Sequence, residues 1–413
     1  MVDEKSRFSE LKVGLSNILE ENILKYWMEN TVDEENGGFI GHINADNTKV
    51  PEAGKGIILN ARILWTFSMA HRVLKNTEYR KMADRAYHYI LSHFRDVTYG
   101  GVFWEVDYLG KPVNGRKQIY AQAFTIYALA EYSRINNKKE VLTWAIDLYE
   151  LIDKHSLNRQ NGGYTEAFEA DWSPMDDVRL SDKDANEKIT MNTHFHILEA
   201  YTNLIRVWPN QKLITAQKKL IYLFLDQFIN RDGHLNLFFD QSWNLKSDII
   251  SFGHDIEASW LMTEAAEIVG DQDLIDLTRH AALKIADNLM EEGMDDDGSI
   301  FNEKNRSTGF FDDDKHWWPQ AEGMVGFLAA YQHSGNDKYL APLFDLWLFI
   351  HNKIIDHEYG EWYWKVSKDG KSFAEDEKVS FWKCPYHNSR ACIEVMQRID
   401  HIQKADYVFR KKN

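Results

Sequence analysis

The stretch Tyr99-Gly100-Gly101-Val102-Phe103-Trp104 decides the fold, because its pattern of glycine followed by bulky apolar residues returns along the whole chain. The further copies are centred on Gly37, Gly162, Gly233, Gly298 and Gly360. Successive copies lie 62 to 71 residues apart, so six units of about 65 residues fill the 413-residue sequence. A regular spacing of this kind indicates that one supersecondary unit is repeated.

Between the copies, apolar residues recur at steps of three and four, which predicts helices. The clearest first helices are 57–74, 120–135, 191–207, 254–269 and 318–331, and second helices follow, as at 79–94 and 274–290. Helical hairpins must bury their apolar faces against neighbours, and neither end shows the polar capping unit of an open array. We therefore predict an all-α fold, an (α/α)6 barrel of six helical hairpins forming one domain over residues 1–413. The glycine loops should form short β-hairpins at one mouth, where the functional pocket is expected.

Composition narrows the class of partner. The formal net charge of -16 disfavours nucleic acid and anionic membranes, which require a basic surface, and favours a neutral substrate over a highly anionic one. No apolar run is long enough to span a membrane, and the charged N-terminus resembles no signal peptide, so we expect a cytoplasmic protein. Cys384 and Cys392 form neither a disulfide framework nor a metal-ligand spacing. A monomer or weak homodimer is expected.

Four segments are unusually dense in His, Trp, Glu and Asn, namely 188–196, 251–260, 316–322 and 382–390. All four fall at the start of predicted inner helices and should face one cavity. His254 and Glu257 are three residues apart, so they share a helix face. A carboxylate beside an imidazole fixes its tautomer and can bring its pKa toward neutrality, which suits proton transfer. Together with His196 and His387, this indicates acid–base chemistry on a small molecule.

A metal site is not expected. His194 and His196 form a His-x-His pair, but their side chains diverge on a helix and cannot chelate together. The acidic runs 295–297 and 312–314 flank turn glycines and lack ligand spacing, which favours solvated loops.

Several other residues have two readings at this stage. Arg62 lies in an apolar helix, so it either pairs with a neighbouring helix or faces the axis to hold a developing oxyanion. Trp317, Trp318 and Trp382 could fill the core or stack on a sugar, and one of the adjacent pair should point away from the axis. Tyr120 begins another inner helix and adds a hydroxyl.

At these motifs the chain resembles the cellobiose 2-epimerases, a group within the N-acylglucosamine 2-epimerase family. The resemblance runs nearly end to end and is carried by Leu59-Asn-Ala-Arg-Ile-Leu-Trp65, by 191–201, by Gly253-His-Asp-Ile-Glu-Ala-Ser-Trp260, by Trp317-Trp-Pro-Gln-Ala-Glu322 and by Trp382-Lys-Cys-Pro-Tyr-His-Asn-Ser-Arg390. It implies an (α/α)6 barrel that needs no metal and no nucleotide cofactor. It also implies inversion of C2 in the reducing-end glucose of cellobiose- or lactose-type disaccharides, through ring opening and an enediolate.

The same resemblance implies roles for individual residues. His254 and His387 would be the acid/base pair at C2, and His196 would assist in ring opening. The residues expected to hold the open-chain sugar or orient a histidine are Arg62, Tyr120, Asn192 and Glu257. The tryptophans expected to face the sugar are Trp317 and Trp382, and the contacts to the distal sugar are Asp184, Glu303 and either Trp362 or Trp364.

Three alternatives stay open from the sequence. A monosaccharide enzyme of the same family, such as a mannose 2-epimerase or a mannose–fructose isomerase, would differ mainly in its loops. An (α/α)6 glycoside hydrolase would need two carboxylates flanking the scissile bond, whereas this pocket is richer in histidine. A non-catalytic sugar-binding protein would need the tryptophans but not three histidines.

Overall fold

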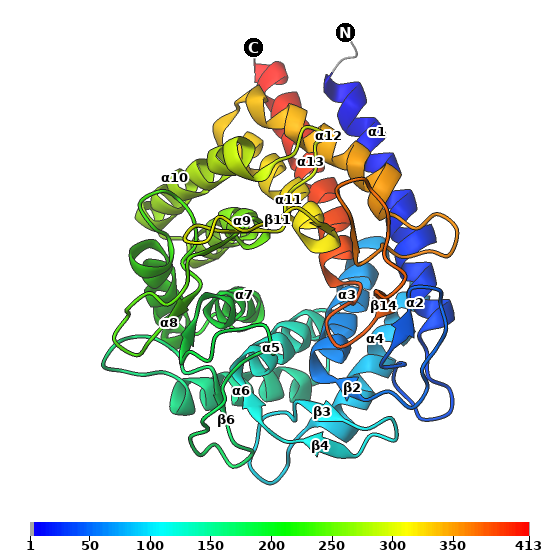
Figure 1. Ribbon diagram of the computed structural model, residues 1–413, viewed down its shortest axis with the longest axis vertical. Coiled ribbons are helices and arrows are strands. Elements are labelled where there is room, and N and C mark those ends of the chain that lie inside the picture. Colours follow the sequence, from blue (N-terminus) through cyan, green and yellow to red (C-terminus); the bar gives the residue numbers. More distant parts are fainter. Residues whose placement is uncertain (1–3, 413) are drawn as a thin grey trace.

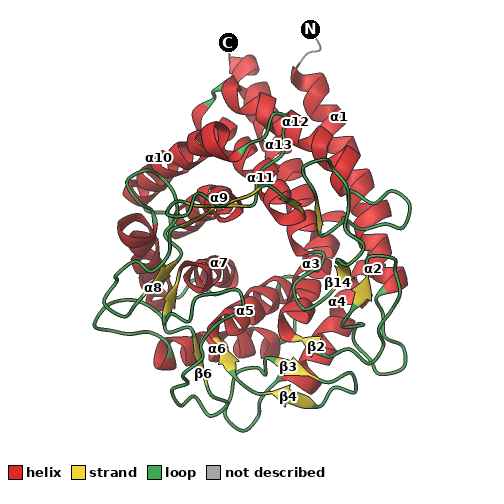
Figure 2. Ribbon diagram, in the orientation of Figure 1, coloured by secondary structure: helices red, strands yellow, loops and turns green. Residues whose placement is uncertain are grey.

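The computed structural model describes residues 4–412 of the chain. Two concentric rings of helices surround one axis (Figure 1, Figure 2). The inner helices are α3 (Ile57–Leu74), α5 (Ile119–Ser133), α7 (Met191–Val207), α9 (Phe252–Val269), α11 (Trp317–Ser334) and α13 (Tyr386–Lys412). The outer helices are α1 (Glu4–Asn17), α2 (Lys25–Asn30), α4 (Thr77–Tyr89), α6 (Lys139–His155), α8 (Gln211–Leu223), α10 (Gln272–Asn288) and α12 (Leu340–Phe349).

The inner ring is closed. Each inner helix contacts the next one along the chain, and α13 returns to contact both α3 and α1. The inner helices are buried on nearly every side; α5, for example, buries every residue from Ile119 to Tyr132. A helix that is apolar all round is stable only when other helices surround it. The predicted (α/α)6 barrel is therefore confirmed.

Short strands join neighbouring units at one end of the barrel. The strands are β1 (Ile43–Asn44), β2 (Lys55–Gly56), β3 (Glu105–Val106), β4 (Pro112–Asn114), β5 (Lys117–Gln118), β6 (Ala167–Phe168), β7 (Ile189–Thr190), β8 (Phe238–Phe239), β9 (Ile249–Ser251), β10 (Glu303–Asn305), β11 (Phe311–Asp312), β12 (Lys315–His316), β13 (Lys365–Val366) and β14 (Glu377–Val379). A strand ahead of each inner helix pairs with a strand from the following unit, and β14 pairs with β1. The strands thus close the ring a second time.

At the opposite end, tight turns join inner to outer helices. Helix α3 ends in a left-handed residue, Lys75, and Asn76 then caps α4 by accepting from the backbone N–H of Glu78. Gly270 and Asp271 make the same turn between α9 and α10. A left-handed C-terminal residue followed by an Asn or Asp cap satisfies both helix ends in few residues.

The outer helices finish in wider turns than the sequence predicts. Residues 4–412 include five π-helical segments, at Ile18–Leu24, Ile90–Phe94, Phe224–Phe228, Leu289–Gly293 and Ile350–Ile354, and a short 3-10 helix at Asp337–Tyr339. Four of the π segments directly follow an outer helix and lead into a glycine turn.

The glycine turns are fastened by buried ion pairs. Lys55 Nζ lies 2.6 Å from Asp33 Oδ2 and donates to the carbonyl of Gly37. The same pairing joins Lys117 to Asp96, Lys315 to Asp295 and Lys378 to Asp356. In the remaining two units, Asn158 with Ile189 and Asn230 with Ile250 stand at the matching positions. Both the lysine and the aspartate of this pair are absent from these two units, so neither unit keeps a single buried charge without its partner.

The fourth residue of four inner helices holds the adjacent glycine turn. Gln122 exchanges two hydrogen bonds with the backbone of Val102, and Gln320 does the same with Ile300. Asp255 accepts from the N–H of Leu235. Each turn is thus locked to the start of the helix that follows it.

His194 occupies the same fourth position in α7. Its Nε2 accepts from the N–H of Tyr164 at 2.8 Å, and its Nδ1 lies 2.7 Å from the carbonyl of Thr190. Both ring nitrogens are used by backbone groups, so His194 is a neutral structural clamp. Neither ring nitrogen is left for a ligand shared with His196.

Candidate active site

The first cavity, of about 660 Å³, lies at the N-terminal ends of the inner helices. Ten of the eleven residues assigned to the site from the sequence line it: Arg62, Tyr120, Asp184, Asn192, His196, His254, Glu257, Trp317, Trp382 and His387. Half of them stand in the first turn of their helix. Tyr120 and Asn192 are second residues of α5 and α7, and His254 is the third residue of α9.

A second cavity, of about 720 Å³, continues from the first. Asp184, His254 and Trp382 border both, and Glu303 lines only the second. The two cavities together give an elongated space whose far part is away from His387.

The structure distinguishes the two candidate tryptophans of the second cavity. Trp364 lines both cavities, whereas Trp362 is 0% exposed inside the core. Of the pair, only Trp364 is in a position to meet a ligand.

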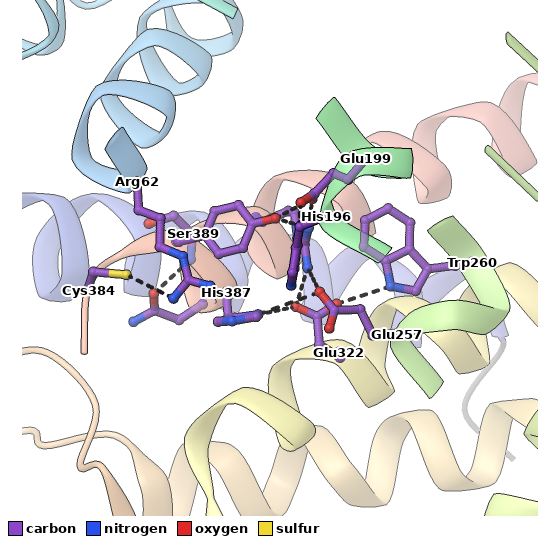
Figure 3. A network of polar contacts seen from close by, with 12 residues as sticks. Arg62, His196, Glu199, Glu257, Trp260, Glu322, Cys384, His387 and Ser389 are labelled. Carbon is purple, nitrogen blue, oxygen red and sulfur yellow. Dashed lines mark hydrogen bonds and ion pairs between the residues drawn. The ribbon is translucent and has the colours of Figure 1, made fainter. Parts of the chain in front are cut away.

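An arginine that the sequence did not single out organises the floor of the first cavity. Arg390, 1% exposed, donates through Nη2 to Glu322 at 2.7 Å and to Glu257, and through Nη1 to Glu199 and the hydroxyl of Tyr386. These side chains belong to four inner helices, α7, α9, α11 and α13. Figure 3 shows Glu199, Glu257 and Glu322 in one network of polar contacts. A buried guanidinium with several donors can hold several carboxylates in fixed positions.

Two of those carboxylates support histidines. His387 Nδ1 lies 2.6 Å from Glu322 Oε1, and His196 Nδ1 lies 2.9 Å from Glu199 Oε2 (Figure 3). A carboxylate is an acceptor, so each Nδ1 carries the proton in these pairs. In a neutral imidazole the other nitrogen, Nε2, then has a free lone pair. Both rings line the cavity, so each can present a base to a ligand.

His254 has a different support. Its Nδ1 lies 2.8 Å from the hydroxyl of Ser251, and Glu257, the partner predicted from the three-residue spacing, turns toward Arg390 instead. The predicted pairing of His254 with Glu257 is therefore wrong. Arg390 donates a charge-assisted hydrogen bond to Glu257, which is stronger than a hydrogen bond with a neutral ring on the same helix, and Glu257 lies 4.0 Å from His387 Nδ1.

Trp318 lies at the site, although the resemblance assigned only Trp317 and Trp382 to the sugar. Its ring centroid lies 4.8 Å from that of His254 and 5.7 Å from that of His387, so it contacts both rings. Trp317 also lines the first cavity, packing on Trp364 at 4.8 Å. The expectation that one of this pair would point away is wrong, because both stand in the first turn of α11, at the cavity.

Four histidines line the first cavity: burial lowers the pKa of His316 to about 4, and the three that were assigned to the site are also neutral at physiological pH. Burial lowers the pKa of His254 to about 3, lowers that of His387 well below its usual value, and lowers that of His196 despite the nearby carboxylate of Glu199. A neutral imidazole can accept a proton, so the resting site is set up with bases rather than with imidazolium ions.

The three carboxyl groups around Arg390 differ in pKa: burial raises the pKa of Glu199, but the charge of Arg390 and the hydrogen bond from His196 outweigh this and lower it to about 2. Burial, and then the charge of Glu322, raise the pKa of Glu257 well above its usual value, and the pKa of Glu322 is raised less. A shared proton therefore resides first on Glu257, which borders the cavity. One ligand atom each of Glu257, Glu322 and His387 lie within 4.8 Å of one another, an arrangement that could hold a metal ion. Here Arg390 already donates to both carboxylates and supplies the positive charge.

Arg62 faces the cavity. Its Nη2 donates to the hydroxyl of Tyr120 at 2.8 Å and its Nη1 to the carbonyl of Trp382 at 3.4 Å, and it lies over the ring of Phe124. Among the described residues no carboxylate pairs with it, and its buried Nε has no hydrogen-bond partner. Of its two readings, the structure favours the one in which it serves a ligand.

Asp184 and Glu303 lie farther from the histidines. Asp184 Oδ2 accepts from the N–H and the hydroxyl of Ser181 at 2.8 and 2.9 Å, which leaves Oδ1 for a ligand. Burial raises the pKa of both acids.

In the described part of the chain no helix is long and apolar enough to cross a membrane.

Comparison with known proteins identifies relatives over almost the whole length. The family model described as N-acylglucosamine 2-epimerase (GlcNAc 2-epimerase) matches residues 38–391. A cellobiose 2-epimerase of Bacteroides fragilis is 46% identical over 387 residues, which cover 94% of this chain and 98% of that protein. A cellobiose 2-epimerase of Dictyoglomus turgidum is 40% identical, with 94% and 100% covered.

Solved structures agree with the sequence comparison. The structure of a cellobiose 2-epimerase from Bacillus thermoamylovorans superimposes with a TM-score of 0.91 at 39% sequence identity. The match covers 94% of this chain and 100% of that one.

Proposed function

The chain belongs to the N-acylglucosamine 2-epimerase family and is a carbohydrate epimerase, and from this premise we propose that it inverts C2 in the reducing-end glucose of cellobiose and related β-1,4-disaccharides. The relatives at 46% and 40% identity are cellobiose 2-epimerases. The two joined cavities support a substrate of two rings, with the reacting sugar beside the histidines and the second sugar beside Glu303 and Trp364.

The reaction needs a base for a weakly acidic proton. After ring opening, the C2 proton lies next to the aldehyde, and its removal gives an enediolate. His387 is a better-defined base than His254, because Glu322 holds the proton of His387 on Nδ1 and leaves the Nε2 lone pair free. His254 would return a proton to the other face of C2, or take it in the reverse direction, and His196 assists at the ring oxygen.

The developing negative charge needs donors. The buried Nε of Arg62 has no hydrogen-bond partner, and Nη2 of Arg62 donates to the hydroxyl of Tyr120. Both Arg62 and Tyr120 can therefore donate a hydrogen bond to the negatively charged oxygen at C1. Glu257 in its protonated form can donate to a sugar hydroxyl. Asn192 has a buried, unpaired Oδ1 at the same cavity and can accept one.

One observation carries the proposal: three neutral imidazoles from three inner helices border one cavity with each Nδ1 occupied by a protein group. The test is proton NMR of cellobiose, lactose, mannose and N-acetylmannosamine, each incubated with the protein in heavy water. We expect loss of the C2 proton signal and appearance of the C2-inverted aldose with the two disaccharides. Accumulation of ketose, turnover of the monosaccharides alone, or release of new reducing ends would contradict the proposal.

A further inference from the structure

One loop segment borders both cavities. Residues 177–184, called here the bridging segment, contribute all of their side chains except Val178 to the first cavity, and several of them to the second. The segment includes Asp184, which lines both cavities. Its position therefore decides how much room a second sugar has.

Two side chains from another unit hold this segment by its backbone. Arg116 Nη2 donates to the carbonyl of Asp177 at 3.2 Å and to that of Arg179 at 3.0 Å. Gln118 Nε2 donates to the carbonyl between them, that of Val178, at 3.3 Å. Three successive carbonyls are thus held from residues 116 and 118. Among the described residues, the other hydrogen bonds of the bridging segment come from its own loop.

Gln118 is itself tied to the cavity wall. Gln118 also donates to Glu166 at 3.2 Å, and buried Glu166 accepts from the hydroxyls of Thr190 and Thr193 at the start of α7. Helix α7 carries Asn192 and His196. The bridging segment is therefore held in register with the wall of the first cavity.

Arg116 has one more donor. Its side chain lines the first cavity, and its Nε is buried without a hydrogen-bond partner. A buried unpaired N–H is unfavourable unless something fills the place, and a sugar hydroxyl is a suitable acceptor.

We propose that Arg116 is a positioning residue for the second, non-reacting sugar: it fixes the bridging segment across the join of the two cavities and so sets the affinity for a disaccharide. This rests on the proposed function. Because Arg116 does not contact the three histidines, its loss should weaken binding without slowing the chemical steps. A contact that is equal in the bound substrate and in the transition state changes KM and leaves kcat.

The test compares Arg116→Ala with two controls. We expect Arg116→Ala to raise KM for cellobiose about 10-fold with kcat within about 2-fold, and Arg116→Lys to recover part of the loss. Arg279→Ala is the matched control, because Arg279 lines neither cavity, donates to Glu267 at 2.7 Å and also has a buried, unpaired Nε, and it should change neither constant. A fall in kcat with unchanged KM, or no change in Arg116→Ala, would overturn the proposal.

A second measurement does not depend on activity. Amide hydrogen exchange of the full chain should become faster in residues 177–184 of Arg116→Ala, or of Arg116→Lys if the alanine variant does not fold, and stay unchanged in the inner helices. Unchanged exchange in the bridging segment would overturn the proposed anchoring. If the unsubstituted protein fails to epimerise cellobiose, the proposed function fails, and this measurement still decides the anchoring.

Discussion

The cavity wall around His387 and the wall around His254 each present an imidazole to the first cavity, but the group that forms a hydrogen bond with Nδ1 differs between them. Behind His387 stands a carboxylate, Glu322, which is itself held by Arg390. Behind His254 stands the hydroxyl of Ser251. A carboxylate only accepts, so it fixes one tautomer, whereas a hydroxyl can donate or accept and allows either. The difference suggests a committed base on one side and a group that can start as base or acid on the other.

The largest effects should come from removing either ring. His387→Ala and His254→Ala should each lower the rate of epimerisation by about 10²–10⁴-fold, because each removes a general acid or base. The sharper measurement is deuterium uptake at C2, started separately from the glucose and the mannose epimer. If each ring serves one face, each variant keeps exchange from only one epimer. Equal exchange from both epimers in both variants would contradict a division of labour between the two walls.

Glu322→Gln should have the next largest effect. The amide can donate to Nδ1 instead of accepting from it, so the tautomer of His387 is no longer fixed, and a charged hydrogen bond is lost. We expect kcat to fall about 10- to 100-fold. Steady-state kinetics on cellobiose measures it, and Gln332, an exposed acceptor for Arg398, offers Gln332→Ala as an inert control. A rise in KM with unchanged kcat would show that Glu322 supports substrate binding rather than the basicity of His387.

Ser251→Ala should have a smaller effect. It removes a neutral hydrogen bond from a ring that is also held against Trp318, so we expect kcat to fall about 2- to 10-fold. Ser251→Thr keeps the hydroxyl and should restore the activity. A loss as large as that of Glu322→Gln would remove the contrast between the two walls.

The pH dependence of kcat/KM tests whether His254 and His387 are both neutral before substrate binds. A base must be unprotonated to act, and burial lowers the pKa of His254 to about 3 and that of His387 in the same direction. As the pH falls through 6.5, the ordinary value for histidine, both rings therefore stay neutral and kcat/KM should hold, declining only at lower pH. An acid limb of kcat/KM centred at or above 6.5 would contradict this electrostatic picture.

The fold could be predicted because its signal is local and repeated. The glycine turns mark each unit, and α3 and α7 have the bounds that the apolar pattern predicts. The wider ends of the outer helices could not be predicted, because a π turn differs from an α turn by one residue per hydrogen-bond ring and leaves the apolar pattern almost unchanged.

The residues at the site were easier to predict than their partners. Helix starts place His196, His254 and His387 at one cavity whatever the details of packing. The choice of Glu257 between His254 and Arg390 depends on how far the Arg390 side chain reaches from α13 toward α9, which no spacing within one helix encodes. Glu199 is three residues after His196, so the spacing rule that failed for Glu257 would have found it.

Ring closure has a consequence for how the protein unfolds. In a row of stacked hairpins, the outermost one has a single neighbour and can detach while the rest stay folded. Here β14 pairs with β1, and α13 packs on both α1 and α3, so every hairpin has neighbours on two sides. Loss of any one would expose apolar surface on both of the others that flank it. We therefore expect denaturant to melt the barrel in one cooperative transition, with the cavity and the helices lost together.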